Sequence, residues 1–111
     1  MKARSSPDRS AKLRGRILAA IRQIPRGKVS TYGAVGRAAG MAQGARYVVR
    51  VLSTSVGLPW QRVVGAGGEI RTRGDSAVEQ RLRLEAEGVT FRRKRVNMAR
   101  HEYKFSRSKN R

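Results

Sequence analysis

The segment that most constrains the fold is Leu58–Val64, a short apolar run that contains a proline and the only tryptophan of the chain. Pro59 fixes its own φ and favours extended geometry in the residue before it, and the two valines that close the run favour a strand. We therefore predict a strand over 60–64. The glycine-rich turn at 65–68 would then return the chain through 69–70 and complete a small β-hairpin.

Two roles are open to Trp60. A lone tryptophan is most often an anchor of the hydrophobic core, because its ring buries a large apolar area. Because the rigid turn defines the direction of the ring, the same side chain could instead form the wall of a pocket for a flat ligand. The segment itself leaves both roles open.

The charge balance points to a polyanion as the partner. The 111 residues include 26 Lys and Arg against 7 Asp and Glu, which gives a net charge of +19. Nucleic acid is the first candidate, and an anionic membrane surface is the second. Membrane binding usually needs a strongly amphipathic basic helix or a lipid anchor, and no apolar run approaches transmembrane length. We therefore expect a nucleic-acid partner and no membrane partner.

The sequence contains no cysteine and a single histidine. This composition excludes disulfides, thiolate metal sites and a cysteine nucleophile, and it argues against zinc. We expect no metal and no cofactor. No secretory signal begins the chain, so we expect a cytoplasmic location, close to the nucleoid for a DNA-binding protein.

The chain divides into one domain and two basic ends. We predict disordered arms over 1–10 and 106–111, because both stretches are polar and basic, and a single domain over 11–105. Apolar residues recur at spacings of three and four up to Pro25, which predicts a first helix from Ala11. The candidates for its N-cap are Asp8 and Ser10.

The next segment predicts a helix-turn-helix. Ser30 or Thr31 is the expected N-cap of a second helix that stops at Gly40, and a third helix is expected over 43–52. Two helices joined by a tight turn on a very basic chain are typical of a DNA-binding unit. The glycines inside the second helix would allow close approach of another helix or of a ligand.

A fourth helix is expected after the basic loop 71–75. Ser76 and Glu79 have the spacing of a capping box, in which each side chain bonds the backbone N–H of the other. The apolar residues expected to pack this helix against the domain are Val78, Leu82 and Leu84.

Four stretches carry a resemblance to a known family: Ile24–Gly33, Ala45–Val48, Pro59–Val64 and Glu87–Val89. Their order and spacing resemble the DNA-binding domain of the alkylguanine-DNA alkyltransferases, and more closely the alkyltransferase-like proteins, which are non-enzymatic relatives of those enzymes. The resemblance implies a mostly α fold with a small β-hairpin. It is the winged-helix-like helix-turn-helix domain that forms the C-terminal domain of the transferases.

The resemblance also implies that the chain does not transfer alkyl groups. In the transferases the proline is followed by a cysteine that takes the alkyl group and by a histidine, backed by a glutamate, that activates it. Trp60 and Gln61 occupy those positions here, and neither side chain is a nucleophile or base at neutral pH. Glu87 matches the glutamate but has no histidine to support. Most alkyltransferase-like proteins keep the histidine, so Gln61 leaves the hydrogen bonding of the pocket open.

The resemblance assigns nucleotide flipping to two residues. Tyr32 matches a tyrosine that helps to turn the target phosphate, and Arg46 matches the arginine that enters the duplex in place of the flipped base. A planar guanidinium can stack on bases, although a plain phosphate contact is the alternative for Arg46. The alternative for Tyr32 is a hydroxyl near a helix start with no further role.

The residues assigned to the lesion pocket are Trp60, Arg73, Pro59 and Tyr103. Trp60 would offer a stacking surface worth roughly 1–3 kcal/mol. Arg73 matches an arginine that lies over the flipped guanine, and its alternative is an ordinary solvated charge. Pro59 and Tyr103 would complete the cavity, with core packing as their alternative.

Further DNA contacts are expected from Lys28, Thr31, Ala45, Tyr47, Arg50 and Arg62. Tyr47 and Val49 stand on the recognition helix where the family has smaller residues. The helix could therefore sit further from the groove, or Tyr47 could contact sugar atoms.

The first function hypothesis is a DNA-lesion sensor that works as a monomer. It would bind duplex DNA, flip guanine alkylated at the 6-oxygen against Trp60, leave the alkyl group in place and present the complex to nucleotide-excision-repair proteins. The alternative is a basic architectural or regulatory helix-turn-helix protein without lesion selectivity, which Gln61, Tyr47 and Val49 favour. A residual enzyme is the third hypothesis.

Overall fold

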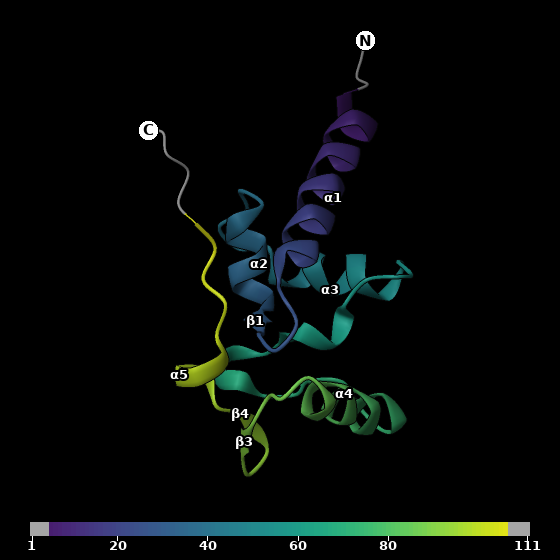
Figure 1. Cartoon of the computed structure of the whole chain (residues 1–111). Helices are drawn as coiled ribbons and strands as arrows, with labels where there is room; N and C mark the ends of the chain where they lie inside the picture. Colours follow the sequence, from purple (N-terminus) through teal and green to yellow (C-terminus); the bar gives the residue numbers. More distant parts are fainter. Residues whose placement is uncertain (1–4, 107–111) are drawn as a thin grey trace.

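The computed structural model describes residues 5–106, which form two groups of elements on either side of two short paired strands (Figure 1). The N-terminal group contains the helices α1 (Ser5–Gln23), α2 (Tyr32–Ala38) and α3 (Ala45–Ser53). The C-terminal group contains α4 (Asp75–Ala86), β3 (Phe91–Arg92), β4 (Arg95–Val96) and the single turn α5 (Met98–His101). Between the groups lie β1 (Ser30–Thr31), the 3₁₀ turn η1 (Trp60–Arg62), β2 (Val63–Val64) and the 3₁₀ turn η2 (Ala66–Gly68). The fold is mostly helical, as predicted.

The first helix begins earlier than predicted. α1 starts at Ser5 and not at Ala11, so Asp8 and Ser10 lie inside the helix, and 5–10 are not a disordered arm. Pro7 falls in the first turn, where its missing N–H removes no helical hydrogen bond. The rest of the two predicted arms, 1–4 and 107–111, lies outside the described residues. Among those described, no helix is both long enough and apolar enough to cross a membrane.

The helix-turn-helix is present as predicted. The Thr31 hydroxyl caps α2 by accepting a hydrogen bond of 3.0 Å from the backbone N–H of Ala34. The chain leaves α2 through Gly40, whose φ of +92° lies in the left-handed region that glycine favours. Gly36 allows the close approach of the next helix, because a Cβ at this position would lie 3.1 Å from the backbone of Gly44.

The strand predicted over 60–64 and its hairpin are wrong. Only Val63–Val64 are a strand, and they pair in parallel with Ser30–Thr31. The three residues before them form the turn η1, and Glu69 makes an isolated bridge with Arg95. Strand propensity does not reveal which segment will lie alongside, and here the partner strand precedes two intervening helices.

The β-hairpin of the fold lies later in the chain. β3 and β4 pair antiparallel, with Phe91 opposite Val96, and Arg93 and Lys94 form the turn between them. Arg93 has a φ of +57°, which two-residue hairpin turns favour but which residues other than glycine seldom adopt. The basic run of the sequence is therefore the tip of a hairpin.

The predictions for α4 fail at its start and for two of its three apolar residues, while Leu84 is fully buried as predicted. No side chain caps the helix, so the expected capping box is absent. Glu79, expected to bond the backbone of Ser76, pairs instead with Arg83 at 2.6 Å, since an acid and a base four residues apart lie on one helix face. Val78 and Leu82, expected to pack inward, are 61% and 60% exposed.

The inner face of α4 is centred on a polar side chain. Gln80 is fully buried, and its Nε2 donates to the backbone carbonyls of Gln61 (3.1 Å) and Val63 (2.9 Å). Its Oε1 accepts a hydrogen bond of 2.7 Å from the Thr72 hydroxyl. A buried amide with all these partners satisfies backbone groups that would otherwise be unpaired, so it holds α4 against the Trp60 segment.

Two hydrophobic clusters form the core, and β2 contributes to both. The first lies among α1, α2 and α3 and includes Ile17, Ile21, Ile24, Val35, Val48, Val51, Leu58 and Val63. The second lies in the C-terminal group and consists of Val29, Val64, Leu84, Val89 and Val96. Successive strand residues point to opposite faces, so Val63 and Val64 enter different clusters and fix the position of η1 between them.

Candidate nucleic-acid interface

Trp60 faces a cavity. Its ring is half-buried and is part of neither hydrophobic cluster. It lines an open cavity of about 390 Å³ where the two groups of elements meet. The other lining residues come from α2, α3, the segment before α4 and the first turn of α4: Tyr32, Val49, Leu52, Ser53, Thr72 and Ser76. Of the two roles open to Trp60, its position fits a cavity wall.

An exposed stripe of α3 runs past this cavity. Arg46, Val49, Arg50 and Ser53 are spaced by three and four residues, so they share one helix face, and all four are exposed. Val49 and Ser53 line the cavity, which places the two arginines beside its mouth. Ala45 is exposed at the start of the same helix. This stripe is the outer side of the second helix of the helix-turn-helix.

A buried carboxylate behind Trp60 holds η1 in place. Glu87 accepts hydrogen bonds from Gly27 N (2.9 Å), Gln61 Nε2 (2.7 Å) and Arg62 Nε (3.0 Å). Arg62 also donates to the carbonyl of Ile24 at 2.9 Å. The network joins the end of α4, the turn after α1 and η1. Gln61 thus bonds Glu87 in place of the histidine of the family, which answers the question of hydrogen bonding that the sequence left open.

The electrostatics of this network keep Glu87 ionised. Burial raises the pKa of Glu87. The hydrogen bonds from Arg62, Gly27 and Gln61 and the charge of Arg62 together lower it by more than burial raises it, so the pKa lies below its usual value. An amide cannot exchange a proton with this carboxylate. The arrangement positions η1 and provides no base.

Tyr32 lies at the start of α2 and lines the cavity together with Trp60. Burial raises the pKa of Tyr32, and the charge of Arg71 lowers it in part, so the value stays above the usual one. The hydroxyl is therefore protonated at neutral pH and can donate a hydrogen bond to a phosphate oxygen.

Three of the four predicted pocket residues, Pro59, Arg73 and Tyr103, are not among those that line the cavity with Trp60. Pro59 directly precedes η1, and Arg73 is an exposed residue next to Thr72. The rings of Tyr103 and Phe105 pack nearly perpendicular to each other, with their centroids 5.0 Å apart, and Tyr103 also packs against the first hydrophobic cluster. Tyr103 is therefore part of the core packing, which was its alternative.

Several of the side chains predicted to contact DNA have partners within the protein. The guanidinium of Arg62 is bound by Glu87, and Tyr47 packs on the first cluster while its hydroxyl donates to the carbonyl of Ser10 at 3.3 Å. The Lys28 Nζ donates to the carbonyl of Arg100 at 3.2 Å, and Thr31 is the cap of α2. Sequence spacing does not give the direction of these side chains, because each direction depends on a tertiary neighbour.

Five residues that line the cavity were not predicted as site residues: Val49, Leu52, Ser53, Thr72 and Ser76. Leu52 lines it from α3, and the Val49 side chain, noted only for its size, lines it as well. Arg83 reaches Trp60 from α4, with its Cζ 5.5 Å from the centre of the ring. The spacing of Val49 and Ser53 from Arg46 could have placed them on one face, but no local signal brings α4 to Trp60.

The charge of the N-terminal group suits a polyanion. Between Asp8 and Glu69 the sequence contains no acidic residue at all, although arginines and lysines recur throughout. The ion pairs among the side chains of residues 9–106 involve Arg62, Arg71, Arg81 and Arg83, so Arg46 and Arg50 have no carboxylate partner within that range. The stripe on α3 is therefore free to meet phosphate groups.

Comparison with known families gives a match over most of the chain. Residues 12–89 match the family model described as the DNA-binding domain of 6-O-methylguanine DNA methyltransferase. The chain is 43% identical over 76 residues to a DNA base-flipping protein of Vibrio parahaemolyticus, which covers 66% of this chain and 76% of the relative. It is 47% identical over 75 residues to alkyltransferase-like protein 1 of Schizosaccharomyces pombe, covering 63% and 69%.

Solved structures show the same relationship. The fold is similar to S. pombe Atl1 in a crystal structure with damaged DNA containing O6-carboxymethylguanine, with a TM-score of 0.76 and 33% identity over 86% of this chain and 97% of that one. It is less similar to the O6-methylguanine methyltransferase of Mycobacterium tuberculosis, with a TM-score of 0.59 and 28% identity over 67% and 47%.

Proposed function

Because the chain belongs to the alkyltransferase-like family of DNA base-flipping proteins, we propose that it recognises guanine alkylated at the 6-oxygen in duplex DNA and leaves the alkyl group in place. The single observation that carries this proposal is the position of Trp60, whose ring lines a cavity beside the exposed stripe of α3. A flat indole at this point can hold a flat base without reacting with it.

In the proposed mechanism α3 brings the lesion to the cavity. A base within a duplex does not expose its alkylated edge for inspection, so the nucleotide must rotate out of the stack. Arg46 would enter the duplex from α3 and occupy the gap, and the Tyr32 hydroxyl would hold the rotated phosphate. The flipped base would then stack against Trp60.

The walls of the cavity divide into an apolar and a polar part. Val49 and Leu52 offer apolar surface suited to an alkyl group, whereas Thr72, Ser53 and Ser76 offer hydroxyls suited to the edge of a purine. The volume of about 390 Å³ lies within the range of sites for small organic groups. The cavity therefore fits a purine with a short alkyl substituent.

The proposal excludes alkyl transfer by this site. The position of a transferase cysteine is occupied by Trp60, and the following Gln61 bonds an ionised Glu87 and cannot act as a base. The protein would hold the lesion as a monomer at cellular DNA and present it to nucleotide-excision-repair proteins. Arg73, next to the lining residue Thr72, would close over the bound guanine.

The test compares two duplexes that differ by one methyl group. At physiological salt, a duplex with a single O6-methylguanine should bind more tightly than its unmodified twin, as measured by fluorescence anisotropy. Trp60→Ala should remove most of the preference, since it deletes a stacking contact worth roughly 1–3 kcal/mol. Arg50→Ala is the control and should weaken both duplexes alike.

Equal affinity of the wild-type protein for both duplexes would overturn the proposal. It would favour the alternative of an architectural or regulatory DNA-binding protein without lesion selectivity. A methyl group transferred to the protein, or an abasic site left in the duplex, would instead revive the residual-enzyme hypothesis.

A further inference from the structure

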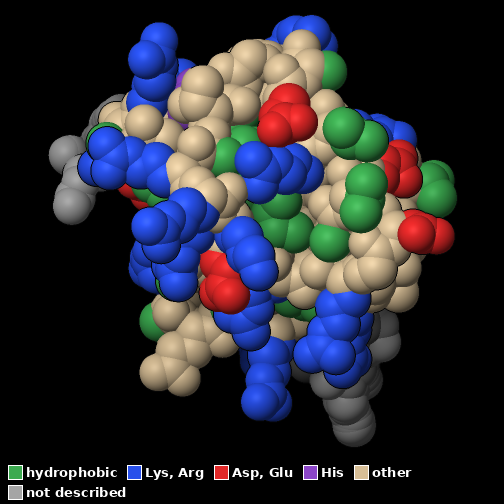
Figure 2. All heavy atoms as spheres, turned by 90° about the horizontal axis from the view of Figure 1, so that it is seen from below, with side chains coloured by type: hydrophobic (Ala, Val, Ile, Leu, Met, Phe, Trp, Pro, Cys, Tyr) green, Lys and Arg blue, Asp and Glu red, His purple; other side chains and the backbone are tan. Residues whose placement is uncertain are grey.

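A second hollow lies on the outer side of α4, away from Trp60. Seen from below, this side of the molecule carries hydrophobic side chains among both acidic and basic ones (Figure 2). The exposed valine and leucine of α4, Val78 and Leu82, are four residues apart and therefore lie on one helix face. They border an open groove of about 510 Å³. Contiguous apolar surface of this kind marks interaction sites.

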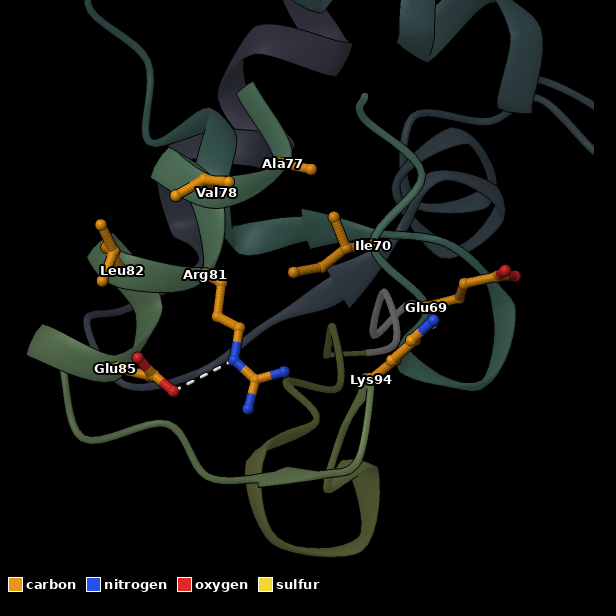
Figure 3. A pocket seen from close by; sticks show the side chains of 8 residues that line it. All are labelled: Glu69, Ile70, Ala77, Val78, Arg81, Leu82, Glu85 and Lys94. Atoms are coloured by element: carbon orange, nitrogen blue, oxygen red, sulfur yellow. Dashed lines mark hydrogen bonds and ion pairs between the residues drawn. The ribbon is translucent and has the colours of Figure 1, made fainter. Parts of the chain in front are cut away.

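The groove has a wall opposite α4. Figure 3 shows Ile70 directed across the gap toward the helix, with Glu69 and Lys94 on the far side. Ile70 comes from the segment before α4, and Lys94 comes from the turn of the β3–β4 hairpin. Three apolar side chains from two segments thus face a common space.

The floor of the groove is held rigidly. Arg81 donates from Nε to Glu85 at 3.1 Å and from Nη1 to the carbonyl of Arg93 at 2.8 Å, and its guanidinium lies 4.2 Å from the centre of the Phe91 ring. These three contacts join α4 to the hairpin. The groove therefore keeps its shape without an occupant, which lowers the entropy lost on binding.

Charge selects the kind of occupant. The hairpin end carries Arg92, Arg93, Lys94 and Arg95 in succession, and none of them takes part in an ion pair with the side chains of residues 9–106. A second copy of this chain would bring another net charge of +19 against this end. Duplex DNA would meet the apolar walls of Ile70, Val78 and Leu82, which offer no hydrogen-bond donor to a phosphate, whereas a peptide can bury apolar side chains against them.

We propose that this groove binds an acidic amphipathic segment of a partner protein. Two apolar side chains of the segment, one helical turn apart, would lie between Val78, Leu82 and Ile70, and its Asp or Glu side chains would face Lys94 and the hairpin tip. This is the helix-in-groove mode of recognition, with charge setting the orientation.

The inference goes beyond lesion recognition and does not depend on it. No residue lines both the groove and the cavity at Trp60, so the protein could hold DNA and a partner at the same time. Trp60→Ala should leave partner binding unchanged, and Leu82→Glu should leave DNA binding unchanged. Failure of one proposal is thereby distinguishable from failure of the other.

The test uses a synthetic acidic peptide of about 15 residues with two leucines four positions apart and glutamates at most others. Amide shifts in ¹⁵N spectra of the full chain should concentrate at Ile70, Val78, Leu82 and Lys94. Leu82→Glu should weaken the peptide about tenfold or more, because it removes apolar contact and adds a like charge. The matched control is Val56→Glu, since Val56 is a 94% exposed valine elsewhere, and it should have no effect.

A charge swap sharpens the assignment. Lys94→Glu should weaken the glutamate peptide and strengthen its lysine counterpart, which a purely apolar contact would not do. Three outcomes would overturn the proposal. The first is an equal loss of peptide affinity in Leu82→Glu and Val56→Glu. The others are amide shifts at Tyr32 and Val49 in place of the groove residues, and self-association of the protein that Leu82→Glu abolishes. The last two outcomes would mean that the peptide mimics DNA or that a second copy occupies the groove.

Discussion

α3 and α4 are helices of similar length, and each turns one side toward solvent, but the two sides differ in how their charges are paired. On α3 the exposed arginines, Arg46 and Arg50, have no carboxylate partner among the side chains described, those of residues 9–106. On α4 two arginines are paired within the helix, Arg81 with Glu85 and Arg83 with Glu79. The number of arginines alone, two in each helix, would have made the two helices look alike. The pairing shows that only α3 presents unneutralised cations for phosphate.

The two helices also differ on their buried sides. α3 packs through the apolar Val48 and Val51 and lies close to α2 because Gly36 allows it. α4 is held by the hydrogen bonds of Gln80 and ends at the ionised Glu87. Packing of apolar surface tolerates small shifts, whereas a buried hydrogen-bond network fixes geometry. The element that carries the binding stripe and the element that fixes Trp60 thus rest on different forces.

The largest expected effect is on DNA affinity, and it tests whether the unpaired arginines of α3 are the ones that contact phosphate. Replacing Arg46 and Arg50 by Ala should weaken binding to any duplex by about a hundredfold at physiological salt, because two phosphate or base contacts are lost. The matched pair Arg92→Ala with Lys94→Ala removes the same charge from the hairpin and should change affinity by less than about threefold. Fluorescence anisotropy over a range of salt concentrations measures both, and equal losses would show that DNA contacts both faces.

The next effect concerns the stability that two ion-paired carboxylates, Glu87 and Glu85, give to the fold. Glu87→Gln should lower the free energy of unfolding by about 2 kcal/mol, because the partly buried Arg62 loses its counterion. The control Glu85→Gln removes an exposed pair and should change it by no more than about 0.5 kcal/mol. Urea denaturation separates the two, and similar values would mean that the network behind Trp60 is no stronger than a surface pair.

The same carboxylate gives a pH dependence. Since the pKa of Glu87 is lower in the folded protein than in the unfolded chain, its stabilisation is complete above about pH 4.3 and is lost as the pH falls through the lower folded value. The stability difference between the wild type and Glu87→Gln should therefore shrink in acid. A difference that grows in acid would contradict the direction of the shift.

The smallest effect tests the close contact of α2 and α3. Gly36→Ala should lower stability by about 1 kcal/mol, because the new Cβ would lie 3.1 Å from the Gly44 backbone. Gly15→Ala in α1 is the control, since nothing lies within 4 Å of a Cβ there, and it should raise stability by about 0.5–1 kcal/mol. Thermal unfolding gives the sign of each change, and a stabilising Gly36→Ala would show that the helices separate freely.

Local signals in the sequence predicted local structure well. The cap at Thr31, the stop at Gly40 and the apolar spacing of Ile17, Ile21 and Ile24 each depend on residues within one or two turns, and all are confirmed. The family resemblance supplied the fold and placed Tyr32 and Trp60 in one site. Short-range chemistry was sufficient for these features.

The errors arose where a residue's partner lies far along the chain. Val63–Val64 pairs with β1 across two helices, Arg62 and Gln61 meet Glu87, and Tyr103 returns to the first cluster. The inward side of α4 was misjudged for the same reason, since Gln80 is buried only because the carbonyls of the Trp60 segment need donors. The spacing of apolar residues does not predict the burial of a polar side chain whose hydrogen-bond partners lie elsewhere in the chain.

The shared strand β2 has a consequence for the dynamics of the molecule. Val63 and Val64 belong to different hydrophobic clusters, so we expect their backbone amide protons to exchange with solvent only when both clusters unfold. Their exchange rates should therefore report the global unfolding of the protein. Trp60 is attached three residues upstream of that slowest-exchanging point. The ring is therefore attached next to the part of the chain that we expect to deform least.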